Sequence, residues 1–110
     1  YRFMRSILFF DLPVEKVSQQ REYRKFIKNI KKLGFYMLQK SVYVKMGIDV
    51  QAIDSTIDKV KKNCPKEGEI SILTITEKQF ASIELLLGEG KTDVINNDER
   101  VIELWASYLK

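Results

Sequence analysis

The 110-residue chain contains no histidine, and this absence excludes several kinds of active site. Without an imidazole there is no Ser-His or Cys-His nucleophile, and no zinc site built on histidine ligands. Any metal ion would have to be bound by oxygen ligands, which favours magnesium (Mg²⁺) or manganese (Mn²⁺). Carboxylates are therefore the side chains in which we look for chemistry.

Cysteine and long apolar runs are also scarce. Cys64 is the single cysteine, so no internal disulfide can form, and a lone thiol is typical of a reducing compartment. Cys64 falls late in a helical pattern, where we interpret it as a small buried side chain. No apolar run approaches the ~20 residues of a membrane span, and the run near the N-terminus is too short for a signal peptide. We expect a cytoplasmic protein without membrane contacts.

Positive charge is concentrated in one part of the chain. Residues 16–45 contain nine Lys/Arg and a single acid, Glu22, whereas residues 46–110 contain eight Lys/Arg and twelve Asp/Glu. The net charge of +4 is therefore the balance between a basic and an acidic part. A basic segment in a folded domain indicates a polyanionic partner, and a solvated helix face is the common alternative.

One carboxylate follows the most apolar stretch of the sequence. Residues 6–13 read Ser-Ile-Leu-Phe-Phe-Asp-Leu-Pro, which is typical of a buried strand that ends near Asp11 and Pro13. A charge at the end of such a strand needs a partner, which is a hydrogen-bond donor, an arginine or a metal ion. One aspartate is a poor magnesium site, but a two-fold axis would supply a second copy of Asp11. The alternative is that Asp11 caps a loop or pairs with an arginine.

Hydrophobic spacing predicts an antiparallel sheet with two helices on one face. The first helix follows an N-cap at Ser18 and stops at Gly34, and the second buries residues 50, 53, 57, 60 and 64. A break near residues 39–41 indicates a bulge or kink, or the division of one strand into two pieces. We predict strands over residues 5–12, 35–46, 69–76 and 80–87, the last with a middle that also fits a short helix, and a short strand over 101–105.

The first predicted helix combines an apolar stripe with a basic face. Tyr23, Phe26 and Ile30 lie on the apolar side. Six cations on the opposite side would neutralise phosphates without reading bases. Arginine binds phosphate oxygens in a bidentate manner, which makes the two arginines the better candidates. The predicted nucleic-acid-binding residues are Arg21, Arg24, Lys25, Lys28, Lys31 and Lys32.

Five segments, in this order, resemble the CRISPR-associated Cas2 family, most closely its members from type II systems. They are residues 9–13 (Phe-Phe-Asp-Leu-Pro), 23–26, 34–39, 41–43 and 74–81, and residues 97–101 add to the likeness. The resemblance implies an α+β, ferredoxin-like fold and a homodimer. It implies a subunit of CRISPR adaptation, or spacer acquisition, that bridges dimers of the Cas1 integrase and binds double-stranded DNA prespacers.

The resemblance also implies a metal-dependent nuclease that acts on RNA or DNA. Asp11 would then be the catalytic residue and the magnesium ligand at the dimer axis, and a stand-alone endonuclease is the alternative function. Phe10, Ser41 and Tyr43 resemble family positions around the site, although an aromatic residue in a strand is more often core. An RNA-recognition module would need a glycine- and aromatic-rich strand, which is absent. We expect a ferredoxin-like domain over residues 1–88 and a C-terminal β extension, for dimer or partner contacts, over 89–110.

Overall fold

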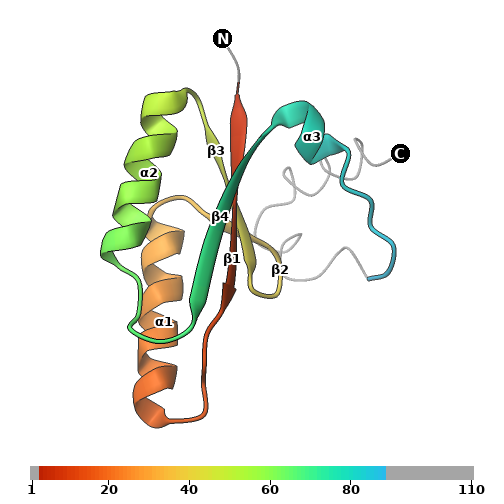
Figure 1. Cartoon of the computed structure of the whole chain (residues 1–110). Helices are drawn as coiled ribbons and strands as arrows, with labels where there is room; N and C mark the ends of the chain where they lie inside the picture. The colour runs from red at the N-terminus through yellow and green to blue at the C-terminus, as the bar shows by residue number, and fades with distance from the viewer. Residues whose placement is uncertain (1–2, 89–110) are drawn as a thin grey trace.

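The computed structural model describes residues 3–88, and the structural statements below concern these residues. Three helices and four strands follow one another along this part of the chain (Figure 1). The predicted strand over 101–105 and the C-terminal extension lie outside the described residues. The elements are β1 (Met4–Asp11), α1 (Val17–Lys32), β2 (Tyr36–Gln39), β3 (Val42–Gly47), α2 (Val50–Lys62), β4 (Glu69–Thr76) and α3 (Glu77–Ala81).

The four strands form one antiparallel sheet in the order β2-β3-β1-β4. β1 lies inside the sheet and pairs with β3 on one side and with β4 on the other. α1 and α2 lie side by side against one face of the sheet, whereas α3 lies on the other side (Figure 1). This arrangement confirms the predicted α+β, ferredoxin-like fold with two helices on one face.

The main core lies between the sheet and the two long helices. Leu8 and Phe10 of β1 pack there with Phe26 and Ile30 of α1, and all four side chains are at least 94% buried. The rings of Phe10 and Phe26 meet edge to face, with centroids 5.4 Å apart at 83°. Burial of each large apolar side chain contributes about 1.5–3 kcal/mol to the stability of the folded state. The end of β1, and with it Asp11, is therefore held by the best-packed part of the molecule.

Alternate residues of β1 point to the opposite side of the sheet, which we call the open face. Ile7 packs there with Val44 and with Phe80 of α3 in a second, smaller cluster. On the same face, Phe9 remains 40% exposed, and Leu73, which pairs with Ile7 across the sheet, remains 51% exposed. Among the described residues, only α3 and the segment that follows it cover part of this face.

An arginine fastens α3 to the open face. Arg5 is only 7% exposed, forms an ion pair with Glu77, and donates to the Tyr36 hydroxyl at 2.7 Å. Its guanidinium also lies 4.6 Å from the centre of the Phe80 ring. Burial is the largest single influence on the pKa of Arg5 and lowers it. Glu77 and Tyr36 together outweigh burial, so the pKa is raised.

The end of α1 agrees with the prediction and its beginning does not. Gly34 follows the helix with φ of +105°, and Phe35 N–H donates to Ile30 O at 3.0 Å, as in a Schellman motif. The N-cap, however, is Lys16 rather than Ser18. The Gln19 side-chain oxygen accepts from Lys16 N–H at 2.9 Å, so a glutamine satisfies the free backbone donor there.

The predicted long strand over residues 35–46 is divided into β2 and β3, which form a hairpin. The turn between them contains Ser41, whose φ is +64°. The pairing of the two strands shifts between Met37 and Gln39, so the irregularity expected in this region is present. Of the two alternatives, division into two strands is therefore correct.

The predicted strand over residues 80–87 is wrong. Residues 77–81 form α3 instead, because Thr76 Oγ1 accepts from Gln79 N–H at 3.0 Å while Gln79 Oε1 accepts from Thr76 N–H at 2.9 Å. This reciprocal capping box starts a helix directly after β4. No strand follows α3 within the described residues.

The buried stripe of α2 also differs in part from the prediction. Ile53 and Val60 are buried as expected, but Val50 is 69% exposed and Cys64 lies beyond the helix with an exposed side chain. Thr56 is buried in their place, with its hydroxyl donating to Ala52 O at 2.9 Å. The helix ends at Lys62, two residues before Cys64, so the stripe cannot include Cys64.

Candidate metal site and basic surface

Asp11 is the last residue of β1, and its side chain is exposed on the open face. The strand is anchored immediately before it, because Phe10 is buried and its N–H donates to Ser41 O at 3.1 Å. Within residues 3–88 the Asp11 carboxylate has no hydrogen bond and no ion pair. The loop-cap and arginine alternatives therefore have no support in this part of the chain.

A second carboxylate lies beside Asp11. Glu69, the first residue of β4, is directly opposite Asp11 in the antiparallel register, so both side chains belong to the open face. Both are exposed. Like charges in directly opposed positions destabilise a sheet, and a bound cation would relieve that repulsion. Sequence reasoning missed Glu69, because only the register of β1 with β4 brings the two residues together.

Gly68 sets the position of this pair of carboxylates. Its φ is +101°, and a Cβ at this site would lie 2.7 Å from Asp11 O and 2.7 Å from Leu12 Cδ2. Only glycine combines this backbone conformation with so close an approach. The loop between α2 and β4 can therefore run against the end of β1, which places Glu69 opposite Asp11.

The donor types at this position fit a hard cation, but one copy of the chain does not complete a site. No group of three or more His, Cys, Asp or Glu side chains occurs in the part of the chain that the structure describes. Magnesium requires six oxygen ligands and commonly takes one or two carboxylates together with waters or substrate phosphates. Asp11 and Glu69 match that pattern only if a second copy, water or a phosphate supplies the remaining ligands.

Phe10, Ser41 and Tyr43 support the end of β1 from behind. Phe10 and Tyr43 are buried in the core under the helices, and their rings stack with centroids 5.7 Å apart at 29°. Burial raises the pKa of Tyr43, and Tyr23 adds to the shift. Ser41 acts through its backbone carbonyl, as described above. None of the three lies on the open face with the Asp11 carboxylate.

The six cations predicted on the first helix are all exposed along α1. None of them forms an ion pair with another described residue. α1 covers the face of the sheet opposite the open face (Figure 1). We call these six residues the basic helix face: Arg21, Arg24, Lys25, Lys28, Lys31 and Lys32. The structure therefore places the basic helix face and the Asp11 carboxylate on two different sides of the molecule.

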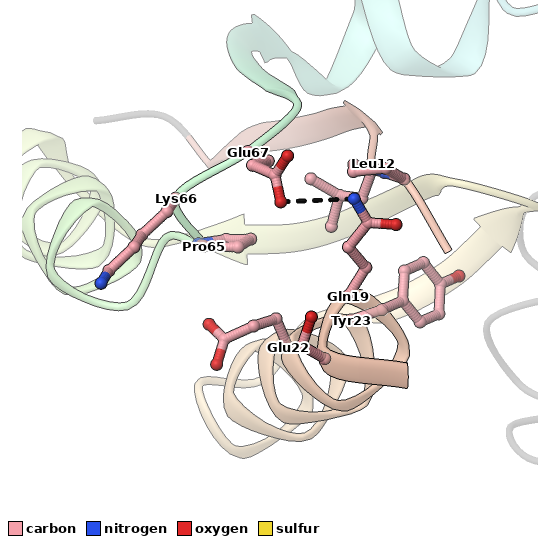
Figure 2. A pocket seen from close by; sticks show the side chains of 9 residues that line it. Leu12, Gln19, Glu22, Tyr23, Pro65, Lys66 and Glu67 are labelled. Carbon is pink, nitrogen blue, oxygen red and sulfur yellow. Dashed lines mark hydrogen bonds between the residues drawn. The ribbon is translucent and has the colours of Figure 1, made fainter. Parts of the chain in front are cut away.

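A cavity of about 230 Å³ lies between the first turns of α1 and the loop before β4. Figure 2 shows Gln19 Nε2 donating to Glu67 Oε1, at 3.3 Å, beside the apolar side chains of Leu12 and Pro65. Two carboxylates, Glu22 and Glu67, contribute to its lining, which makes it unsuited to phosphate. This cavity is therefore not the site predicted from the sequence.

Cys64 has the properties of an unreactive thiol. Its Sγ donates to Val60 O at 3.3 Å, and partial burial raises its pKa above the ordinary value for cysteine. A raised pKa lowers the fraction of thiolate, which is the nucleophilic form. Separately, none of the described helices is long and apolar enough to cross a bilayer.

Comparison with known proteins agrees with this arrangement. The family model described as "CRISPR associated protein Cas2" matches residues 4–83, a span that includes every element from β1 to α3. A CRISPR-associated endoribonuclease Cas2 of Treponema denticola is 46% identical over 101 residues, which cover 92% of this chain and all of that protein. A protein of the same name from Streptococcus mutans serotype c is 42% identical over 105 residues, 96% of each chain.

Proposed function

The chain belongs to the CRISPR associated protein Cas2 family, and on that premise we propose that it is the dimeric bridging subunit of a CRISPR adaptation complex. In this role a homodimer binds duplex DNA prespacers and joins dimers of the Cas1 integrase. One observation carries the proposal. The sheet has an apolar open face that ends in the Asp11 carboxylate, and the opposite side of the molecule carries a row of cations, none of them paired with another residue of the described range 3–88.

The open face is suited to contact with a second copy of the chain. Phe9, Met46 and Leu73 lie on it and are 40%, 45% and 51% exposed. Contiguous exposed apolar side chains mark interaction sites. Packing this face against itself about a two-fold axis would bury these residues and bring the two Asp11 carboxylates into one interface.

The carboxylates on the open face supply the donors for a divalent cation. Asp11 from each copy, with Glu69 beside it, would hold Mg²⁺ or Mn²⁺ together with waters or substrate phosphate. When bound, such an ion polarises a phosphodiester and lowers the pKa of its water. Asp11 itself would orient the ion, since it is the last residue of a strand anchored by the buried Phe10.

The second candidate function is a stand-alone, magnesium-dependent endonuclease that acts on RNA or DNA. The relatives' name, endoribonuclease, and the exposed Asp11 carboxylate favour it. The two functions share the fold and the dimer, and they differ in whether Asp11 has to perform chemistry.

Replacement of Asp11 with Ala separates the two functions. The bridging function predicts that spacer acquisition continues in cells carrying Asp11→Ala, while any metal-dependent nuclease activity of the purified protein is lost. If acquisition stops although the variant still assembles with the integrase, the bridging function alone is insufficient. Asp11→Asn serves as the isosteric control, since it removes the charge and keeps the shape.

The dimer is tested with Leu73→Asp on the open face. Sedimentation analysis should show a shift from dimer to monomer, because two desolvated carboxylates would face the interface. Val50→Asp is the matched control, since Val50 is 69% exposed on α2, away from the open face. If the Leu73→Asp variant remains dimeric, the proposed interface is wrong.

A further inference from the structure

The C-terminal end of α2 brings additional lysines close to α1. Lys59, Lys61 and Lys62 occupy the last turn of α2. The side chain of Asn63, the next residue, accepts a 3.5 Å hydrogen bond from the Asn29 amide in the last turn of α1. The two asparagines therefore mark the line along which the exposed surfaces of the two helices meet.

Helical spacing places three lysines around this pair of amides. Lys25 precedes Asn29 by four residues and Lys32 follows it by three, so both lie on the same side of α1 as Asn29. Lys59 precedes Asn63 by four residues, and Asn63 Nδ2 donates to Lys59 O at 2.7 Å. Lys25, Lys32 and Lys59 are all exposed.

The lysines along this line are not engaged in ion pairs with described carboxylates, although Glu22 is exposed three residues before Lys25. Within residues 3–88, Lys25, Lys32 and Lys59 have no ion pair. Lys45, whose ammonium donates to Leu33 O at the end of α1, has a pKa lowered first by burial and then by the nearby charge of Lys59. An arrangement of ammonium groups that repel one another is stabilised by a bound anion.

Stabilisation of helix termini does not account for all of these lysines. Cations in the last turn of a helix interact favourably with the helix dipole, which explains Lys32 and Lys59. Lys25 lies in the middle of α1, where the dipole effect has fallen away. A cluster that spans two helices and includes a mid-helix residue fits an external anion better.

We propose that Lys25, Lys32 and Lys59, with Asn29 and Asn63 between them, form an inter-helix clamp for the phosphate backbone of the DNA duplex. The clamp rests on the proposed function, and it extends the duplex-binding surface from α1 to α2. Lysines and side-chain amides bind phosphate oxygens without reading the base sequence. The proposed duplex-binding surface therefore includes residues of both α1 and α2.

The test compares Lys59→Glu with Lys61→Glu in the full chain. Both residues are exposed in the same turn of α2 and both changes reverse one charge, but Lys61 lies two residues on and so on the other side of the helix. Fluorescence anisotropy with a labelled DNA duplex of mixed sequence, at several salt concentrations, gives the affinity and its salt slope. Arg24→Glu on the basic helix face tests the proposed function separately.

The logarithm of the association constant falls linearly with the logarithm of the salt concentration, and loss of one phosphate contact makes that slope shallower by about 0.9. This corresponds to a loss of about eightfold in affinity at 0.1 M relative to 1 M salt. Lys59→Glu should show this loss and Lys61→Glu should not. Lys59→Arg, which keeps the charge, should bind like the unmodified chain. If Arg24→Glu weakens binding and Lys59→Glu does not, the clamp is wrong and the proposed function stands. Equal losses from Lys59→Glu and Lys61→Glu would indicate a general charge effect, which also contradicts the clamp. If none of the three reversals weakens binding, both proposals fail.

Discussion

Gly68 determines where the candidate metal ligands sit, and replacing it with alanine tests that statement directly. The glycine has φ of +101°, and an added Cβ would lie 2.7 Å from the Asp11 carbonyl oxygen. That oxygen belongs to the backbone of a core-anchored strand and cannot move aside as the end of a flexible side chain would. Gly68→Ala should therefore shift the loop before β4 away from β1.

The cost has two parts. A left-handed backbone conformation costs a non-glycine residue about 1–2 kcal/mol. Forcing an extra methyl group into a filled space costs a further 1–3 kcal/mol, roughly. The free energy of unfolding should therefore fall by about 2–5 kcal/mol in Gly68→Ala.

Gly34 provides a matched control. Its φ is +105°, but an added Cβ would first meet the flexible Lys45 side chain, at 3.4 Å. Gly34→Ala should therefore cost only the conformational part, about 1–2 kcal/mol. Urea denaturation of both variants, at equal protein concentration because subunit association adds to stability, gives the difference. Equal losses in the two variants would refute the close approach of Gly68 to Asp11.

Three further predictions concern the arginine, the thiol and the metal. Glu77→Gln leaves the buried Arg5 charge without its ion pair and should lower the melting temperature more than Glu84→Gln, since Glu84 is exposed and unpaired among the described residues. The raised pKa keeps the Cys64 thiol protonated in the folded protein at an alkaline pH where the thiol of the unfolded chain ionises. Iodoacetamide should therefore react more slowly with the folded chain than with the chain in urea. Mg²⁺ should raise the melting temperature of the unmodified protein and not that of Asp11→Asn, and an equal rise in both would place the ion elsewhere.

Prediction from sequence succeeded where local signals were strong. The apolar run that ends at Asp11 is a buried strand, and the amphipathic pattern that stops at Gly34 is a helix. It failed where a weaker local signal was overlooked. Thr76 and Gln79 have the spacing of a capping box, and this local signal prevails over the strand-like apolar residues that follow. Phe80 is buried because the helix turns its ring toward Arg5.

The amino-acid sequence alone determined the nature of the two candidate sites. It identified the carboxylate at the end of a strand, the absence of histidine that restricts a metal site to oxygen ligands, and the basic helix face. These properties depend on residue type and on spacing within one element, so they can be read along the chain.

Only the tertiary structure decided how these parts lie relative to one another. It placed Glu69 opposite Asp11, set the end of α2 beside the last turn of α1, and put the carboxylate and the basic helix face on opposite sides of the sheet. Strand register and helix packing follow from contacts between residues far apart in the chain, such as Gly68 against Asp11. No local pattern records those contacts, and therefore the sequence identified the chemistry while the fold determined its position.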